Sequence, residues 1–243
     1  FVDMGTRWKE VIGLKSKGQA HLALASFIVN NGIHKKEYAC KIVSDGDGPL
    51  RENTTNFAQM ARKYGVQHET LPPYCPELNL AEPAIGQVWN MGRTVMLDAL
   101  LPDEFFLHGL KTAAYIQNRL AIRRPQYVDG KNVSFYTTAY ELVMSETPQI
   151  GHLRPFGCDA YVHAPKDKRR SKNLGMIRSE QGIFIGYKDP RKRIYTVKLE
   201  SGPLLDTIHV DFDTDGFGLL YNKELSPFRE TNSLPNIPRV VYE

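Results

Sequence analysis

Apolar and polar residues follow patterns that predict alternating strands and helices over the first 71 residues. Residues 8–14 alternate polar and apolar side chains, and apolar residues recur at helical spacing between Gly18 and Gly32. Asn and Thr precede the next helical pattern and Gly65 follows it, as at the ends of a helix. The expected elements are a strand within 1–16, a helix at 18–32, a strand at 38–44, a helix at about 53–64 and a strand at 66–71. This order is that of an α/β fold.

The pattern changes in the rest of the chain. Its next expected elements are helices at 81–99 and 102–120, a polar surface loop at 123–134 and a short helix at 138–144. Beyond His152, short apolar strands alternate with turns, at 160–162, 182–187, 194–197 and 208–210. Several short strands in so short a stretch indicate a small β-barrel. The last 20 residues are interpreted as a linker.

Composition narrows the class of protein. The 243 residues are 42% hydrophobic and 10% aromatic, which suits a packed globular protein. No window approaches 18 uncharged apolar residues, so we expect no membrane span and no membrane partner. Cys40, Cys75 and Cys158 lie far apart and show no ligand spacing with the histidines. They are interpreted as reduced structural thiols, and no zinc site is expected.

Two carboxylates carry the candidate chemistry. Asp45 follows an expected strand in the segment Ser44-Asp45-Gly46, and Glu82 stands at the start of an expected helix, with 36 residues between the two acids. Transfer at a phosphodiester is served by two divalent ions about 4 Å apart, held by carboxylates from different elements. A lone Asp before Gly is more often a turn residue, and a lone Glu in a first helical turn more often interacts with the helix dipole. The two together predict metal-dependent phosphoryl transfer on a polynucleotide.

These segments resemble the DDE integrase family, and most closely the copia-type (Pseudoviridae) retrotransposon integrases. In that family the last acid ends the segment G-[IV]-x-H-x-x-x-x-P-Y-x-P-x-x-N-G-V-A-E, and much of this pattern stands in residues 65–82. Asp45 and Glu82 match the second and third acids. Asp47 and Glu77 are rival positions, but the Ser before Asp45 and the Asn-x-Ala before Glu82 favour the first pair. Further family tags stand in the family's order at residues 1–7, 101–106, 112–119, 152–162 and 184–187.

The resemblance implies a fold, and with it a division of the chain. The expected fold class is α/β, an RNase H-like integrase core with a mixed sheet whose first strand is missing, followed by a small all-β barrel of the SH3 type. The expected parts are the core at residues 1–125, a connecting segment at 126–150, the basic barrel at 151–215 and a linker or tail at 216–243.

The resemblance also implies an activity, a cofactor and partners. Integrases of this kind join the 3′ ends of element DNA to host DNA with two Mg²⁺ or Mn²⁺ ions, here with Asp45 and Glu82 as catalytic residues and metal ligands. The complete integrase is expected to form homo-oligomers. Its expected location is the nucleus or a cytoplasmic virus-like particle, and it is not expected to be secreted.

The chain departs from the family in ways that bear on activity. Gly46, Pro49 and Pro83 replace residues usual in the family, and Glu82 comes one position early. The family's first catalytic Asp lies upstream of the Phe-Val-Asp with which this chain begins, and Asp3 matches a non-catalytic position. We therefore expect a piece of a longer polyprotein that has no strand-transfer activity by itself. The alternative is a non-enzymatic DNA-binding or chromatin-binding protein derived from a decayed element.

Positive charge is concentrated near the expected barrel. Residues 148–200 hold 12 Lys and Arg against 5 Asp and Glu, whereas the net charge of the whole chain is +4. Such clusters supply salt-dependent contacts to DNA phosphates, although a solvated loop or a nuclear-import tract is an equal alternative. The candidate DNA-binding residues are Lys166, Lys168, Arg169, Arg170, Lys172, Arg191, Lys192 and Arg193.

Overall fold

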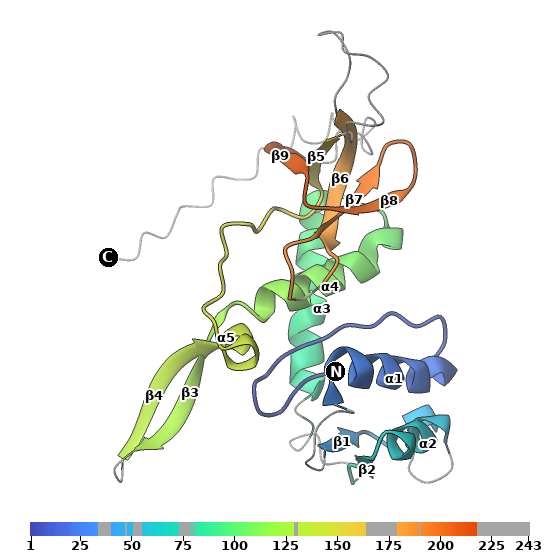
Figure 1. Ribbon diagram of the computed structural model, residues 1–243, viewed down its shortest axis with the longest axis vertical. Helices are drawn as coiled ribbons and strands as arrows, with labels where there is room; N and C mark the ends of the chain where they lie inside the picture. Colours follow the sequence, from blue (N-terminus) through green and yellow to red (C-terminus); the bar gives the residue numbers. More distant parts are fainter. Residues whose placement is uncertain are drawn as a thin grey trace. The chain divides into compact units, whose positions relative to one another are not determined.

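The chain divides into two compact units in the computed structural model (Figure 1). Unit 1 comprises Phe1–Met91 and Ala113–Pro148, and unit 2 comprises Gly92–Thr112 and Gln149–Glu243. The boundaries of the four parts expected from the sequence stay a prediction. The structure describes residues 1–33, 40–46, 48–50, 55–72, 79, 81–128, 131–163, 179–189 and 191–217. No helix in this described part is long and apolar enough to cross a bilayer.

Unit 1 contains a parallel strand pair packed against two helices. Strand β1 (Cys40–Ser44) pairs with β2 (Val66–Thr70) in the register Cys40 to Val66. The helices are α1 (Ala20–Asn30), after the 3-10 turn η1 (Lys17–Gln19), and α2 (Asn56–Lys63). A second 3-10 turn, η3 (Gly48–Leu50), follows β1. The core between them consists of Leu24, Ile28, Phe57, Ala61 and Val66. The described elements from residue 20 to residue 70 confirm the predicted α/β order.

Local residues determine where helix α2 begins and ends. The side chain of Thr55 accepts a hydrogen bond from the backbone N–H of Ala58 at 3.3 Å, so Thr55 is the N-cap. Gly65 follows the helix with a φ of +68°. This left-handed conformation favours glycine and ends the helix there.

The first 16 residues contain only an isolated bridge between Val2 and Lys9, so the strand predicted over residues 8–14 is wrong. Asp3 instead forms a turn, in which its Oδ2 accepts hydrogen bonds from the backbone N–H and the hydroxyl of Thr6 at 2.7 and 2.6 Å. The backbone of Lys9 bonds to a distant side chain, Asn118. A contact 109 positions away leaves no periodic signal in the local sequence.

Helices α3 (Ala81–Ala99) and α4 (Phe106–Gln117) confirm the two predicted helices, and the 3-10 turn η5 (Asp103–Phe105) precedes α4. The boundary between the two units falls within both helices. In unit 2 they approach closely, because a Cβ on Gly92 would meet Leu110 Cδ2 at 2.7 Å. Met96, Ala99 and Leu101 then form a core with strand residues of the same unit.

Residues 123–134 form part of a hairpin and not the polar loop predicted from the sequence. Strand β3 (Ala121–Val128) pairs antiparallel with β4 (Lys131–Thr138). The prediction relied on polarity, but antiparallel pairing does not require burial. It also overlooked the Asp129-Gly130 pair, which is a strong hairpin signal between two extended runs. Helix α5 (Ala139–Met144) follows directly and confirms the short helix predicted there.

Unit 2 contains a five-stranded antiparallel sheet in the order β8-β7-β6-β5-β9. Its strands are β5 (Cys158–His163), β6 (Ser179–Tyr187), β7 (Tyr195–Leu199), β8 (Leu204–Thr207) and β9 (Val210–Phe217). The predicted strand at 208–210 is wrong in its bounds, because Ile208 and His209 lie between β8 and β9.

The sheet curls strongly. Phe212 in β9 and Tyr195 in β7 have ring centroids 4.9 Å apart, although β5 and β6 lie between their strands. In a flat sheet these strands would be about 14 Å apart. Gly186 allows part of this curvature, since the β6–β7 register shifts between Phe184 and Gly186. The described strands therefore agree with the barrel-like part predicted from the sequence.

Candidate functional site

Asp45 lies exposed immediately after the last residue of β1. The backbone of Ser44 is fixed, because its carbonyl accepts a hydrogen bond from the N–H of Leu71 at 2.8 Å. The hydroxyl of Ser44 donates to the carbonyl of Leu50 at 3.2 Å and lies 2.9 Å from Nε2 of His68. The loop that carries Asp45 is thus held at both ends, while the carboxylate itself faces solvent.

His68 is placed as a support for this loop. It stands on β2, and its ring meets Phe57 edge-on with centroids 5.0 Å apart. One ring nitrogen is engaged by Ser44. We therefore assign His68 a positioning role for the loop that carries Asp45.

Glu82 lies exposed in the first turn of α3. Asn79 starts this helix, since its Oδ1 accepts a hydrogen bond from the N–H of Ala81 at 3.1 Å and its carbonyl accepts one from Glu82 at 3.2 Å. Pro83 falls within the first turn, where backbone N–H groups have no partner inside the helix, so the missing N–H costs little. The position predicted for Glu82, at a helix start, is what the structure shows.

Lys9 links α3 to the rest of unit 1. Its Nζ donates hydrogen bonds to Gln87 Oε1 on α3 at 2.9 Å and to Gln117 Oε1 at the end of α4 at 2.6 Å. Gln117 in turn donates to the carbonyl of Gln87 at 2.9 Å. Burial, with the nearby charge of Arg7, lowers the pKa of Lys9. These bonds fix the helix that carries Glu82.

Sequence reasoning named the segment around Asn118 as a family tag but gave it no role. Asn118 is buried, and Arg119 beside it places its guanidinium 3.5 Å from the ring centre of Tyr115 and 4.6 Å from that of Tyr140. The only local signal was an Asn-Arg pair at a helix end. Asn118 and Arg119 acquire their structural roles through Lys9 and Tyr140, which are distant in the sequence.

Of the other acids weighed from the sequence, Asp3 is the one that the described residues include. Asp3 is engaged in its own turn, and Asp47 and Glu77 lie outside the described residues. Within the described ranges, no group of three or more His, Cys, Asp or Glu side chains could hold a metal ion. Asp45 and Glu82 offer the oxygen donors that Mg²⁺ prefers, so their chemistry fits such an ion. Two carboxylates supply only some of the oxygen ligands that the ion needs.

A cavity of about 520 Å³ opens beside β2 in unit 1. Lys41, Arg62 and His68 are among the residues that line it, together with Glu69, which forms an ion pair with Lys41. Neither Asp45 nor Glu82 is among its described lining residues. The cavity is therefore separate from the two candidate acids.

Arg191, Lys192 and Arg193 lie in the turn between β6 and β7 of unit 2. Asp189 shapes this turn by accepting hydrogen bonds from the N–H groups of Arg191 at 2.7 Å and Lys192 at 3.2 Å. Lys192 and Arg193 are exposed. The other predicted basic cluster, with Lys166, Lys168, Arg169, Arg170 and Lys172, lies outside the described residues.

A second charged group lies on the sheet of unit 2. Lys188 Nζ is 2.8 Å from Asp206 Oδ2, and the hydroxyl of Thr196 donates to Asp206 Oδ1 at 2.8 Å. Burial would raise the pKa of Asp206, but these two partners outweigh it and hold that pKa below its usual value. Burial and the charge of Lys111 lower the pKa of His108, against the opposing effect of Asp206. These charges lie in unit 2, whereas the candidate acids lie in unit 1.

Comparisons with known proteins show what the chain is similar to. Residues 158–224 match the retroviral polymerase SH3-like domain, which covers β5 to β9. The chain is 25% identical over 250 residues to the Retrovirus-related Pol polyprotein from transposon RE2 of Arabidopsis thaliana, covering 98% of this chain and 16% of that protein. It is 29% identical over 198 residues to the Pol polyprotein from transposon TNT 1-94 of Nicotiana tabacum, covering 78% of this chain and 13% of that one. Over most of its length, the chain is similar to retrotransposon Pol polyproteins.

These matches confirm the resemblance to retrotransposon polyproteins that the sequence motifs indicated. The chain spans 16% or less of the length of these Pol polyproteins. Among solved structures, a chain of the simian T-cell lymphotropic virus intasome in complex with PP2A regulatory subunit B56 gamma has a TM-score of 0.44 at 15% identity. That likeness covers 87% of this chain and 70% of the other, and it is too weak to bear on the function.

Proposed function

We propose that this Pol segment is part of a copia-type integrase that joins 3′ ends of element DNA to host DNA. Asp45 and Glu82 would be two of its metal-binding acids, on an RNase H-like core. One observation carries the proposal: both carboxylates are exposed at the ends of elements whose backbones are fixed by side-chain hydrogen bonds. Such preorganised, accessible carboxylates suit a site that must receive a large polyanionic substrate.

The reaction is a transesterification. The 3′-hydroxyl oxygen of the element end attacks a phosphorus atom of the target strand, a new P–O bond forms, and the bond to the target's 3′ oxygen breaks. The attacking hydroxyl loses its proton and the leaving oxygen gains one. Bound Mg²⁺ or Mn²⁺ would stabilise both oxygens. Asp45 and Glu82 would present their carboxylate oxygens as metal ligands in fixed positions, and no protein nucleophile is required.

The basic residues of unit 2 fit a second role in the same proposal. Lys192 and Arg193 lie exposed in the β6–β7 turn, where they can reach phosphate oxygens. We assign the same role to the basic cluster at residues 166–172. The complete integrase would act on DNA as a homo-oligomer, located in the nucleus or in a cytoplasmic virus-like particle.

The test is an assay of DNA-end joining with a longer Pol segment that includes these residues. Asp45→Asn and Glu82→Gln should each abolish Mg²⁺-dependent joining while leaving DNA binding intact. Asp47→Asn and Glu77→Gln are the matched controls, since they are the rival acids, and should retain joining. A polypeptide of residues 1–243 supplies only two of the family's three acids and should not join DNA. Full joining by Asp45→Asn or Glu82→Gln would contradict the proposal.

One observation favours a non-enzymatic alternative. The first turns of α3 present Ile85 and Trp89 to solvent, with 59% and 46% of their surfaces exposed, and residues 81–91 contain no Lys or Arg. An exposed apolar stripe without positive charge, on the helix of Glu82, suits a protein partner better than DNA. If the longer segment binds DNA but never joins it, and the acid variants change nothing, this alternative is the better account.

A further inference from the structure

The hairpin of β3 and β4 stands out because its outer part is exposed on both strands. Each strand has eight residues, paired without a bulge from Ala121–Thr138 to Val128–Lys131. Only the last two residues of β4 are buried, next to α5. Eight residues of strand span about 27 Å. The hairpin is thus a two-stranded ribbon that extends from unit 1 (Figure 1).

The two faces of the ribbon differ. Residues opposite each other in a pair point to the same side, so Arg123 and Tyr136 share one face with the pair Pro125 and Ser134. Tyr136 has 73% of its surface exposed. The opposite face carries Phe135 and Val133, which are exposed to 40% and 42%. One face therefore combines the cation of Arg123 with phenol and hydroxyl groups, and the other combines apolar side chains with the cation of Lys131.

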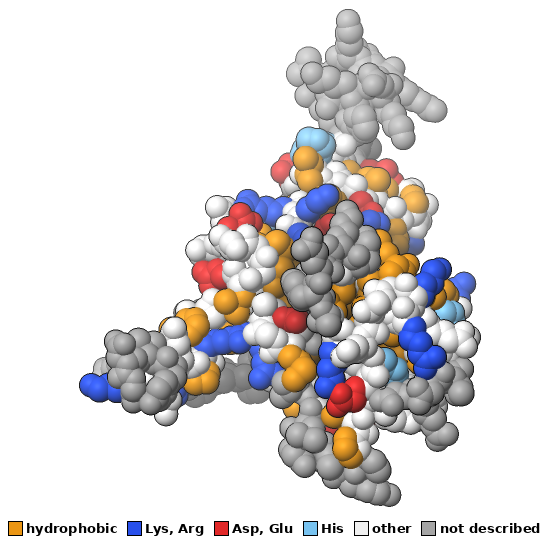
Figure 2. Space-filling model, turned by 60° about the horizontal axis from the view of Figure 1, so that its bottom comes forward, with side chains coloured by type: hydrophobic (Ala, Val, Ile, Leu, Met, Phe, Trp, Pro, Cys, Tyr) orange, Lys and Arg blue, Asp and Glu red, His pale blue; other side chains and the backbone are white. Residues whose placement is uncertain are grey.

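Charge on the ribbon is almost all positive. Residues 121–138 contain Arg123, Arg124 and Lys131 against one acid, Asp129, which lies outside the described part of the chain. Figure 2 shows Lys and Arg side chains among apolar ones on this hairpin, at the lower left, and no described acid between them. Arg124 anchors the ribbon, since its Nη1 donates to the carbonyl of Gly5 at 2.6 Å. Arg123 and Lys131 are exposed.

We propose that this ribbon is a docking surface for duplex DNA, lying in a groove with Arg123 and Lys131 against phosphates. A two-stranded ribbon fits the major groove of DNA in width. Arg, Lys, Tyr and Ser side chains are common donors to phosphate oxygens. The positive charge complements the DNA backbone, and the exposed phenol of Tyr136 beside Arg123 adds a neutral donor. The inference rests on the proposed function, in which DNA is the partner.

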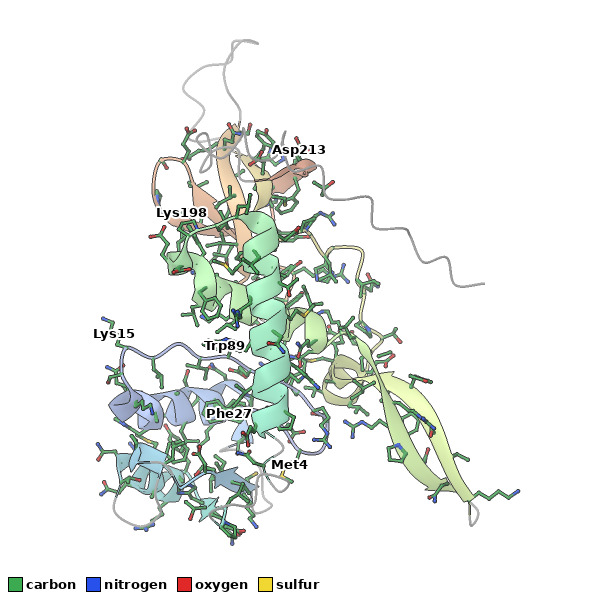
Figure 3. The ribbon with its side chains drawn as sticks, turned by 180° about the vertical axis from the view of Figure 1, so that it is seen from behind. Met4, Lys15, Phe27, Trp89, Lys198 and Asp213 are labelled. Atoms are coloured by element: carbon green, nitrogen blue, oxygen red, sulfur yellow. The ribbon has the colours of Figure 1, made fainter. Side chains whose placement is uncertain are left out.

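The experiment measures binding of the full 243-residue chain to a 30-base-pair duplex at several salt concentrations. Arg123→Ala/Lys131→Ala should weaken binding at low salt and reduce the slope of log K against log salt by about two, since each phosphate contact contributes about 0.9. Lys15→Ala/Lys17→Ala is the matched control. It removes the same charge from an exposed segment of unit 1, where Figure 3 labels Lys15, and should leave the slope unchanged.

Two further variants separate charge from folding. Arg123→Lys/Lys131→Arg keeps both charges and should retain the wild-type slope. Tyr136→Phe keeps the ring and removes the hydroxyl, and should weaken binding a few-fold with an unchanged slope.

An Arg123→Ala/Lys131→Ala slope equal to that of the wild type would overturn the inference. So would a duplex affinity too weak to measure in the wild-type chain. Loss of self-association in sedimentation, with DNA binding unchanged, would make the ribbon an interface between copies instead. Each of these results leaves the assay of Asp45 and Glu82 standing, so failure of the ribbon is distinguishable from failure of the proposed function.

Discussion

Asn118 and Lys9 hold each other by two hydrogen bonds, although 109 positions separate them in the chain. The side-chain oxygen of Asn118 accepts from the Lys9 N–H at 2.8 Å, and its amide nitrogen donates to the Lys9 carbonyl at 2.8 Å. The Asn118 carbonyl also accepts from the N–H of Tyr140 at 2.8 Å. One buried side chain thus takes the place of a neighbouring strand for the segment that begins the chain.

Replacing Asn118 by Ala should lower the free energy of unfolding of unit 1 by about 1–3 kcal/mol, because two partly buried backbone groups of Lys9 lose their partners. Urea unfolding followed by tryptophan fluorescence measures this, since Trp8 and Trp89 both lie in unit 1. Asn30→Ala is the control, because Asn30 is exposed, and should change the same free energy by less than about 0.5 kcal/mol. Equal effects of the two variants would contradict the role given to Asn118.

Gly186→Ala should destabilise the sheet of unit 2 by more than about 2 kcal/mol. Gly186 has a φ of +134°, and a Cβ there would lie 2.7 Å from Oγ1 of the buried Thr112. Gly202→Ala is a matched control, because its φ of +112° is also strained but nothing lies within 4 Å of its Cβ. Hydrogen exchange of β6 amides should show the larger loss of protection for Gly186→Ala. A loss of protection no greater than that of Gly202→Ala would contradict the expected clash between the Cβ added at Gly186 and Thr112.

The capping box of α5 predicts a pH dependence of stability. Glu141 Oε2 accepts a hydrogen bond from the Thr138 N–H at 2.9 Å, and the Thr138 hydroxyl accepts one from the Glu141 N–H at 3.0 Å. The backbone bond from Thr138, followed by the Thr137 side chain, holds the pKa of Glu141 below its usual value. A carboxyl group whose pKa is lowered by folding stabilises the fold at pH values above its pKa in the unfolded state. This stability is lost as the pH falls through the pKa in the folded state.

Thermal unfolding of Glu141→Gln against the wild type checks this dependence. The difference in stability between the two proteins should be greatest near neutral pH and should shrink as the solution becomes acidic. Thr138→Ala, which removes the other half of the box, should cost about 1 kcal/mol. A difference for Glu141→Gln that stays constant with pH would contradict the account.

Ser44→Ala tests whether the loop of Asp45 must be held in place. In a joining assay with the longer Pol segment, this variant should reduce the joining rate about tenfold with DNA affinity unchanged, because small displacements of a reacting group are costly. Thr70→Ala, at the paired position on β2, is the control and should have a smaller effect. A Ser44→Ala rate equal to that of the wild type would show that the Ser44 bonds do not position Asp45.

The sequence predicted those elements whose signals are local. The bounds of α3 follow from its helical spacing and from the Asn79 cap, and α2 follows from Thr55 and Gly65. The hairpin was missed because the prediction relied on the polarity of this stretch. Its apolar residues Val133 and Phe135 stay exposed, so the strands carry no burial pattern that would reveal them. The structure of the first segment depends on Asn118, which no local pattern reveals.

The candidate site was predictable to the same extent. The strand end at Asp45 and the helix start at Glu82 were predicted from local patterns, and the structure shows both. The supports were not predictable: the contact of Ser44 with His68, and the bridge from Lys9 to Gln87 and Gln117, join segments that are distant in sequence. The metal-binding roles of the two acids stay predictions.

The central claim is that Asp45 and Glu82 bind the catalytic metal ions, and a metal-specificity switch tests it most directly. In the longer Pol segment, Asp45→Cys and Glu82→Cys replace an oxygen donor by sulfur, which Mg²⁺ accepts poorly and Mn²⁺ accepts more readily. Each variant should be inactive in DNA-end joining with Mg²⁺ and should regain part of its activity with Mn²⁺, while Asp47→Cys behaves like the wild type with both ions. Equal activity of Asp45→Cys and Glu82→Cys with the two ions would contradict the claim.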